Sequence, residues 1–124
     1  MKTIYTFLLI LATLNMATAQ EWKWLNPLPQ GSGLNCIVFA DAGTGYAVGD
    51  GGAILKTTNG GAEWTSQASG TDSDLYSVFF TDAETGFAVG VNMILKTTNG
   101  GKLWTQMPSG VADYFSFSSV FFTD

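Results

Sequence analysis

Short hydrophobic runs alternate with glycine-rich and polar turns along most of the chain, and this pattern predicts an all-β fold. After residue 30 no stretch is long enough without glycine or another turn signal to predict a long helix. The runs form two sets of four predicted strands, which cover residues 34–40, 46–48, 53–57 and 64–67, and residues 75–80, 87–89, 93–97 and 104–107. The first run of each set does not alternate, which predicts a strand buried on both faces. The last run is more polar, as expected of an outer edge strand.

The two sets are copies of one repeat. Lys56 to Thr65 recurs 40 residues later as Lys96 to Thr105, with the Lys-Thr-Thr-Asn-Gly-Gly run unchanged. The other matches are Gly45–Gly49 with Gly86–Gly90 at 41 residues, Val38-Phe39 with Val78-Phe79 at 40 and Val120-Phe121 at a further 42, and Trp24, Trp64 and Trp104 at intervals of 40. Four short strands in about 40 residues are typical of one blade of a β-propeller. A β-sandwich is the structural alternative, but it would not need such faithful repetition.

The repeats predict an incomplete propeller of about two and a half four-stranded blades, since a closed ring needs roughly four to eight. We expect repeats at approximately 34–67 and 75–107, and the start of a third at 118–124, within a domain that covers 20–124. Trp22 to Leu25 is expected to form the outer strand of a blade that closes the ring. The chain is therefore expected to be a fragment of a longer protein, and its open blade edges predict possible self-association.

Residues 1–19 have the pattern of a secretory signal peptide. Lys2 supplies the positive start, residues 7–12 supply an apolar run, and Ala17-Thr18-Ala19 matches a cleavage site after Ala19. A membrane anchor is the alternative, but the apolar run is shorter than the ~20 residues that a spanning helix needs. We therefore expect a secreted, periplasmic or cell-surface protein.

The segment between the third and fourth predicted strands carries the most specific motif. It reads Thr-x-Asn-x-Gly-x-x-Trp in both copies, at Thr57, Asn59, Gly61 and Trp64, and at Thr97, Asn99, Gly101 and Trp104. An asparagine side chain can accept bonds from nearby backbone, glycine supplies positive φ, and tryptophan can pack over a tight hairpin. A ligand or calcium site is the alternative, but neutral asparagines are weaker cation ligands than carboxylates. We interpret the motif as a structural turn and expect no metal and no cofactor.

Composition and charge exclude several function classes. The chain has no histidine and, with Lys2, Lys23, Lys56, Lys96 and Lys102 as its five basic residues, no arginine. Ser–His–Asp triads, His–Cys zinc sites and arginine clamps cannot be built from it. A net charge of −5 without a basic patch argues against nucleic-acid binding. Cys36, the one cysteine, lies in an apolar run and is interpreted as a small core residue.

The motif and its surroundings resemble a known family. Thr-x-Asn-x-Gly-x-x-Trp resembles the Asp-box of bacterial neuraminidase repeats. Together with aromatic-Ala-Val-Gly and Ile-Leu-Lys-Thr-Thr-Asn-Gly-Gly, it is similar to the photosystem II assembly and stability factors and their non-photosynthetic relatives, over residues 22–124. The resemblance implies a seven-bladed propeller and, for the photosynthetic members, a non-enzymatic chaperone with an arginine-rich patch. Many relatives are secreted or surface proteins.

Three functions remain open from the sequence. The leading hypothesis is a non-catalytic secreted or cell-surface propeller module that binds or scaffolds a protein or a glycan and meets membranes only through a partner. The first alternative is a photosystem II assembly factor-like chaperone. The second is a non-catalytic piece of a glycosidase or sialidase. The residues considered for that chemistry are the pairs Asp72/Asp74 and Asp82/Glu84 and the tyrosines Tyr46, Tyr76 and Tyr114. Because the acids lie on predicted turns and arginine is missing, we predict that the chain is not an enzyme.

Overall fold

The computed structural model describes residues 33–111 and 114–123. The predicted signal peptide at 1–19, the predicted outer strand at Trp22 to Leu25 and the repeat position of Trp24 lie outside these residues. Within them, no helix combines the length and the apolar character that crossing a membrane requires. The described residues form two antiparallel four-stranded sheets, followed by a segment without assigned strands.

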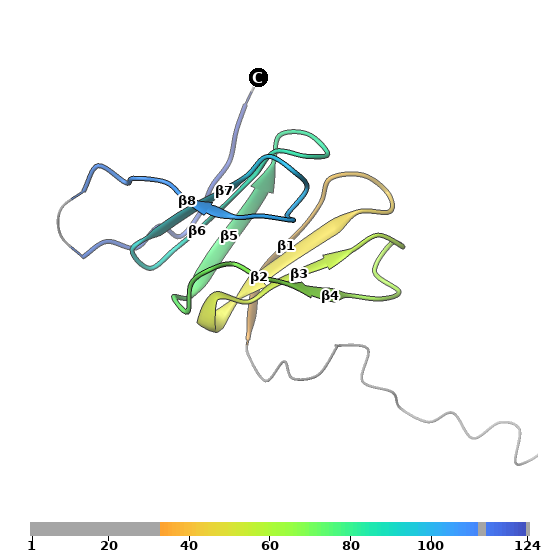
Figure 1. Ribbon diagram of the computed structural model, residues 1–124, viewed down its shortest axis with the longest axis horizontal. Coiled ribbons are helices and arrows are strands. Elements are labelled where there is room, and N and C mark those ends of the chain that lie inside the picture. Colours follow the sequence, from red (N-terminus) through yellow and green to blue (C-terminus); the bar gives the residue numbers. More distant parts are fainter. Residues whose placement is uncertain (1–32, 112–113, 124) are drawn as a thin grey trace, which may run out of the picture.

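The first sheet contains four strands in chain order and forms the first blade (Figure 1). Its strands are β1 (Leu34–Phe39), β2 (Gly45–Gly49), β3 (Ile54–Thr57) and β4 (Thr65–Gln67). A short 3₁₀ turn, η1 (Asp50–Gly52), connects β2 to β3, and Gly51 within it has φ of 65°. Neighbouring strands pair only with their sequence neighbours, so hairpin turns fix the register.

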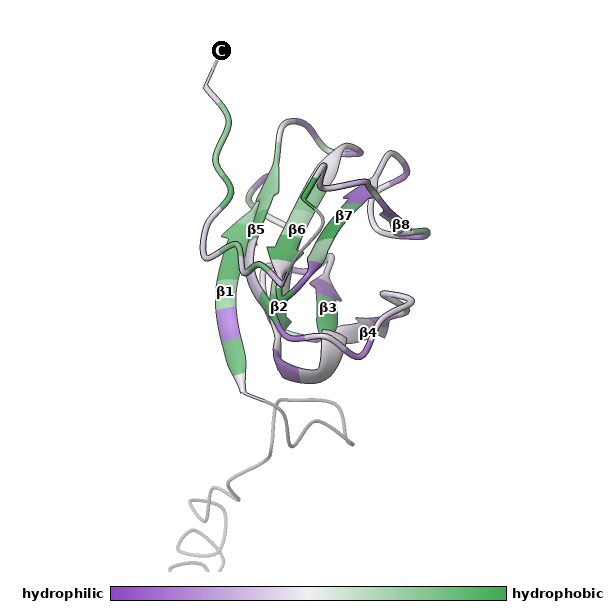
Figure 2. Cartoon of the chain, turned by 90° about the vertical axis from the view of Figure 1, so that its left-hand side faces the viewer, coloured by the Kyte–Doolittle hydropathy of each residue, from purple (hydrophilic) through white to green (hydrophobic). Residues whose placement is uncertain are grey.

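The second sheet repeats this arrangement as the second blade. Its strands are β5 (Leu75–Phe80), β6 (Gly86–Gly90), β7 (Met93–Thr97) and β8 (Thr105–Gln106). The all-β prediction of a partial propeller is confirmed, and each observed strand overlaps the hydrophobic run that predicted it. In Figure 2, hydrophobic colours follow β1, β2 and β5, whereas β4 is more hydrophilic, as predicted for an outer edge.

The core lies between the two blades. The first blade contributes side chains from β2 and β3, and the second contributes side chains from β5, β6, β7 and the turn before β8. The largest of these buried side chains are Tyr46, Val48, Ile54, Leu75, Phe80, Leu95 and Trp104. Burial of a face on each sheet is what holds one blade against the next.

The expectation that each first strand is buried on both faces is wrong for β1. Ile37 and Phe39 are 58% and 46% exposed, whereas their counterparts on β5, Val78 and Phe80, are 3% and 7% exposed. The difference follows from position, because β5 packs on the first blade while no described sheet covers the outer face of β1.

The strand pairing also corrects the alignment of the first strands. Phe39 pairs with Gly45, and Phe80 pairs with Gly86, so Phe39 corresponds to Phe80 at 41 residues rather than to Phe79 at 40. The offset falls to 40 only after the β2–β3 connection, because the first blade has one more residue there, within η1 and Ala53. The Val-Phe dipeptides that matched in the sequence are therefore not equivalent in space.

The segment expected to open a third repeat lies against the second blade. Among its described residues, 118–123, none is assigned to a strand, because a ladder of backbone pairs is missing there. Even so, the Phe122 ring packs on Phe87 with centroids 4.7 Å apart, just as Phe80 packs on Tyr46 at 3.8 Å. The Val120 N–H also donates to Ser77 Oγ at 3.2 Å. The segment thus takes the place on the second blade that β5 takes on the first.

Candidate functional site

The first motif turn, residues 57–64, is closed by its own side chains. Asn59 Oδ1 accepts from the Thr57 hydroxyl at 3.0 Å and from the Glu63 N–H at 2.9 Å. Thr57 Oγ1 accepts from the Gly61 N–H at 3.0 Å. The Trp64 indole N–H donates to the Gly61 carbonyl at 3.1 Å, and its ring meets Phe39 edge-on. These bonds occupy the polar groups that a ligand or cation would need.

The second motif turn, residues 97–104, has the same bonds but a different tryptophan environment. Asn99 Oδ1 accepts from the Thr97 hydroxyl at 3.0 Å and from the Leu103 N–H at 2.9 Å, and Thr97 Oγ1 accepts from the Gly101 N–H at 2.9 Å. Trp104, however, is only 5% exposed, and its indole N–H has no acceptor among the described residues. Packing against the neighbouring blade therefore distinguishes two turns that are nearly identical in sequence.

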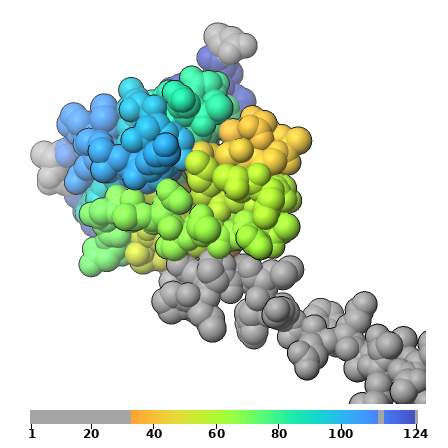
Figure 3. All heavy atoms as spheres, turned by 45° about the vertical axis from the view of Figure 1, so that its right-hand side comes forward, coloured from red at the N-terminus to blue at the C-terminus, as the bar shows by residue number. Residues whose placement is uncertain are grey.

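A hydrogen-bonded junction joins the first blade to the second motif turn. The Gly100 carbonyl accepts from Tyr46 Oη at 2.9 Å and from Lys56 Nζ at 2.7 Å. Burial raises the pKa of the Tyr46 hydroxyl above its ordinary value of 10.0, and the nearby Asp41 charge raises it further. In Figure 3, the blue surface around residue 100 borders directly on the yellow-green surface of the first blade. Tyr46 is thus a structural donor in the interface between blades.

Sequence reasoning did not find this junction. The available signal was that an aromatic residue and a lysine recur at equivalent places, as Tyr46 and Lys56 and as Phe87 and Lys96. Nothing in the sequence indicates which carbonyl the lysine reaches, since the acceptor lies 44 residues further along the chain.

Two of the carboxylates considered for acid–base chemistry, Asp74 and Asp82, accept hydrogen bonds from backbone N–H groups, as does Asp41. Asp82 Oδ1 accepts from the backbone N–H groups of Glu84 and Thr85, and Asp41 Oδ1 does the same for Gly43 and Thr44, all at 2.7–2.8 Å. Asp74 Oδ1 accepts from the Gly51 N–H at 2.8 Å. Within residues 33–111 and 114–123, no group of three or more His, Cys, Asp or Glu side chains could hold a metal ion.

The hydrogen bonds to Asp41 and Asp82 predict that the fold loses stability at acid pH. Hydrogen bonds from the backbone N–H of Thr44 and, to a smaller extent, of Gly43 lower the pKa of Asp41 below its ordinary 3.8. Those from Glu84 and, to a smaller extent, Thr85 lower the pKa of Asp82 in the same way. A carboxyl with a depressed folded pKa stabilises the fold above its unfolded pKa and loses that contribution as pH falls through the folded value. We expect the free energy of unfolding, measured with urea, to fall as pH decreases below about 4. The D41N/D82N variant should show a shallower dependence, and an unchanged slope would contradict this role.

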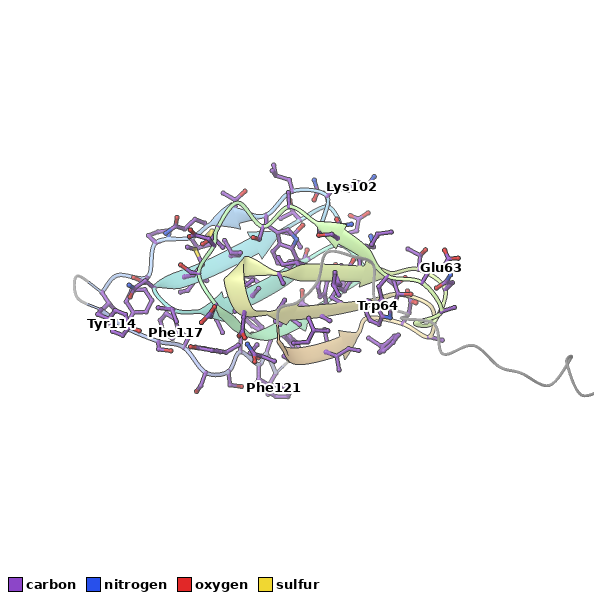
Figure 4. The ribbon with its side chains drawn as sticks, turned by 90° about the horizontal axis from the view of Figure 1, so that it is seen from below. Glu63, Trp64, Lys102, Tyr114, Phe117 and Phe121 are labelled. Carbon is purple, nitrogen blue, oxygen red and sulfur yellow. The ribbon has the colours of Figure 1, made fainter. Side chains whose placement is uncertain are left out.

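The remaining candidates lie apart from one another. Cys36 is half-buried, with its thiol 3.9 Å from the Val78 carbonyl, and packs against the core. Figure 4 places Glu63 and Trp64 at one end of the molecule and Tyr114 and Phe117 at the other. An open hollow of about 520 Å³ adjoins the segment that carries Tyr114. None of the described residues that line it has a titratable side chain; they are Asn92, Gln106, Met107, Pro108, Ser109, Gly110, Val111 and Phe115.

Comparison with known proteins places the repeat in a family. The family model described as "Photosynthesis system II assembly factor YCF48" matches residues 14–111. Among solved structures, "YCF48 bound to D1 peptide" is 28% identical with a TM-score of 0.60 over 73% of this chain. "YCF48 from Cyanidioschyzon merolae" is 30% identical with a TM-score of 0.57 over 72%. No curated protein matches.

The matched structures are propellers much longer than this chain. The chain spans 32% of the first and 27% of the second, which is about a third of their length or less. The family model, in contrast, matches most of the chain, including both blades and both motif turns. The chain therefore belongs to the family of the photosynthesis system II assembly factor YCF48.

Proposed function

We propose that the chain is a non-catalytic protein-binding module that acts in the assembly of a larger complex. The observation that carries this proposal is its membership of the YCF48 family, one member of which was solved with a D1 peptide bound. This favours a polypeptide partner over a glycan. Asp41, Asp74 and Asp82 accept hydrogen bonds from backbone N–H groups, which is consistent with a binding module rather than a hydrolase. The signal peptide pattern at 1–19 supports export, which we include in the proposal.

The experiment measures binding of the full chain to a fluorescently labelled D1 peptide by anisotropy. We expect saturable binding with a Kd of about 1–100 µM, the range of modest protein–peptide affinities. A scrambled D1 peptide of the same composition is the control and should bind at least about tenfold more weakly, a difference of about 1.4 kcal/mol. Equal binding of both peptides, or no saturation by about 1 mM, would contradict a specific polypeptide partner. Binding to immobilised glycans instead would favour the surface glycan-binding alternative.

A further inference from the structure

Each motif turn contains an asparagine followed by a glycine, the dipeptide in which asparagine deamidates most readily. Asn59-Gly60 and Asn99-Gly100 lie in identical runs of Lys-Thr-Thr-Asn-Gly-Gly. In such a pair the deprotonated backbone nitrogen of the glycine attacks the side-chain Cγ of the asparagine, because glycine has no Cβ to obstruct the approach. The new N–Cγ bond closes a succinimide ring, while the Cγ–Nδ2 bond breaks and ammonia leaves. Water then opens the ring to aspartate or isoaspartate.

The second motif turn withholds the nitrogen that would attack. The Gly100 N–H donates to the Glu84 carbonyl at 2.9 Å, and Gly100 is buried. A base must remove this proton before the nitrogen can react, and solvent does not reach a buried N–H that is bonded to a carbonyl. Deamidation of Asn99 therefore needs the same local opening as hydrogen exchange of the Gly100 amide.

The interface between the blades adds a second restraint on that opening. The Gly100 carbonyl accepts from Tyr46 Oη at 2.9 Å and from Lys56 Nζ at 2.7 Å, and both donors belong to the first blade. Gly100 can expose its N–H only by leaving these donors as well as the carbonyl within its own blade. The first motif turn has the matching bond within its blade, from the Gly60 N–H to the Gly43 carbonyl at 2.9 Å.

We propose that Asn99 is a deamidation site whose conversion is controlled by the junction between the blades, so that Asn99 reacts when the Gly100 turn leaves Tyr46 and Lys56. The site is independent of the proposed protein-binding function. Its aspartate product keeps the turn, because the bonds from Thr97 and Leu103 both end at Oδ1, an acceptor that aspartate shares with asparagine. The isoaspartate product has a longer backbone and breaks the turn, so conversion leaves a lasting record that the junction has opened.

The experiment follows both asparagines in the full chain by peptide mapping after incubation at neutral pH. Trypsin cuts the chain after each lysine, so Asn59 and Asn99 fall in different peptides. In urea we expect equal rates at the two sites, because the two residues on either side of each asparagine are identical. In the folded chain, conversion of Asn99 should be at least about tenfold slower than in urea.

Tyr46→Phe tests the junction, because it removes one donor from the Gly100 carbonyl and keeps the aromatic ring. We expect conversion of Asn99 to rise about threefold to tenfold above its rate in the unchanged chain, while conversion of Asn59 stays within about twofold. The Gly100 amide should exchange its hydrogen faster by a similar factor. Tyr114→Phe is the matched control, since it removes the hydroxyl of a tyrosine that is 77% exposed, and it should change neither rate.

Lys56→Met removes the other donor to the same carbonyl and should act in the same direction as Tyr46→Phe. Equal acceleration of Asn59 and Asn99 would overturn the proposal, because global unfolding would then control both sites. An unchanged rate at Asn99 in both junction variants would also overturn it, as would conversion of Asn99 in the folded chain as fast as in urea. Circular dichroism establishes that each variant is folded.

Discussion

Replacing Trp104 with alanine is expected to lower the free energy of unfolding by about 3–5 kcal/mol, the range for removing a buried tryptophan. Trp104 is 5% exposed and lies in the core between the two blades. Its ring meets Phe80 edge-on at 6.0 Å and 88°, and Phe80 in turn stacks on Tyr46. The substitution would leave a cavity at the point where the second motif turn joins the first blade, so both blades should lose stability together.

The matched control is Trp64→Ala at the same motif position of the first blade. Trp64 is half-buried and packs against Phe39, which is itself 46% exposed. We expect this variant to lose about 1–2 kcal/mol, because less apolar area returns to water. Urea denaturation followed by circular dichroism measures both values. Equal losses would show that the motif, rather than packing between blades, determines the contribution of each tryptophan.

The strands and motif turns could be predicted because their causes are local. In residues 57–63 and 97–103, the asparagine accepts one bond from the threonine hydroxyl two residues before it and one from the backbone N–H four residues after it, and the glycines adopt positive φ. The sequence therefore contains everything the turn needs. The same is true of the inner strands, which are short apolar runs bounded by glycine-rich or polar turns. Copying these local signals twice is what made the blade recognisable.

The interface between blades could not be predicted, because it depends on residues far apart in the chain. The motif gives Trp64 and Trp104 the same surroundings in sequence. In the structure the neighbouring blade buries Trp104, whereas Trp64 is only half-buried. β1 and β5 likewise have similar apolar runs, but only β5 has another described sheet packed against the face that is exposed on β1. The extra residue at η1 is visible in the sequence as a change of offset from 41 to 40, but the Val-Phe pairs match at 40 and so align β1 with β5 one residue out of register.

Replacing Gly90 with alanine is expected to cost about 3 kcal/mol or more, the upper range for steric overpacking. Gly90 ends β6, and a methyl group there would overlap the Asp74 carbonyl oxygen and stand 2.8 Å from Leu75 Cα. That carbonyl also accepts from the Val91 N–H at 3.0 Å, so any shift that relieves the overlap would break this bond. Gly49 on β2 has the same close approach to the Gly33 carbonyl, which indicates that each blade requires glycine here.

Gly110→Ala is the control that separates steric overlap from backbone strain. Gly110 has φ of 73°, and a Cβ there would meet no atom within 4 Å, so alanine should cost only the strain of a left-handed backbone, about 1–2 kcal/mol. Gly90 has no such φ, and its larger loss would come from contact alone. Thermal and urea unfolding of both variants measure the difference. A Gly90→Ala loss no greater than that of Gly110→Ala would mean that β5 and β6 can move apart, and that the glycine at the end of the second strand is not what sets the spacing within a blade.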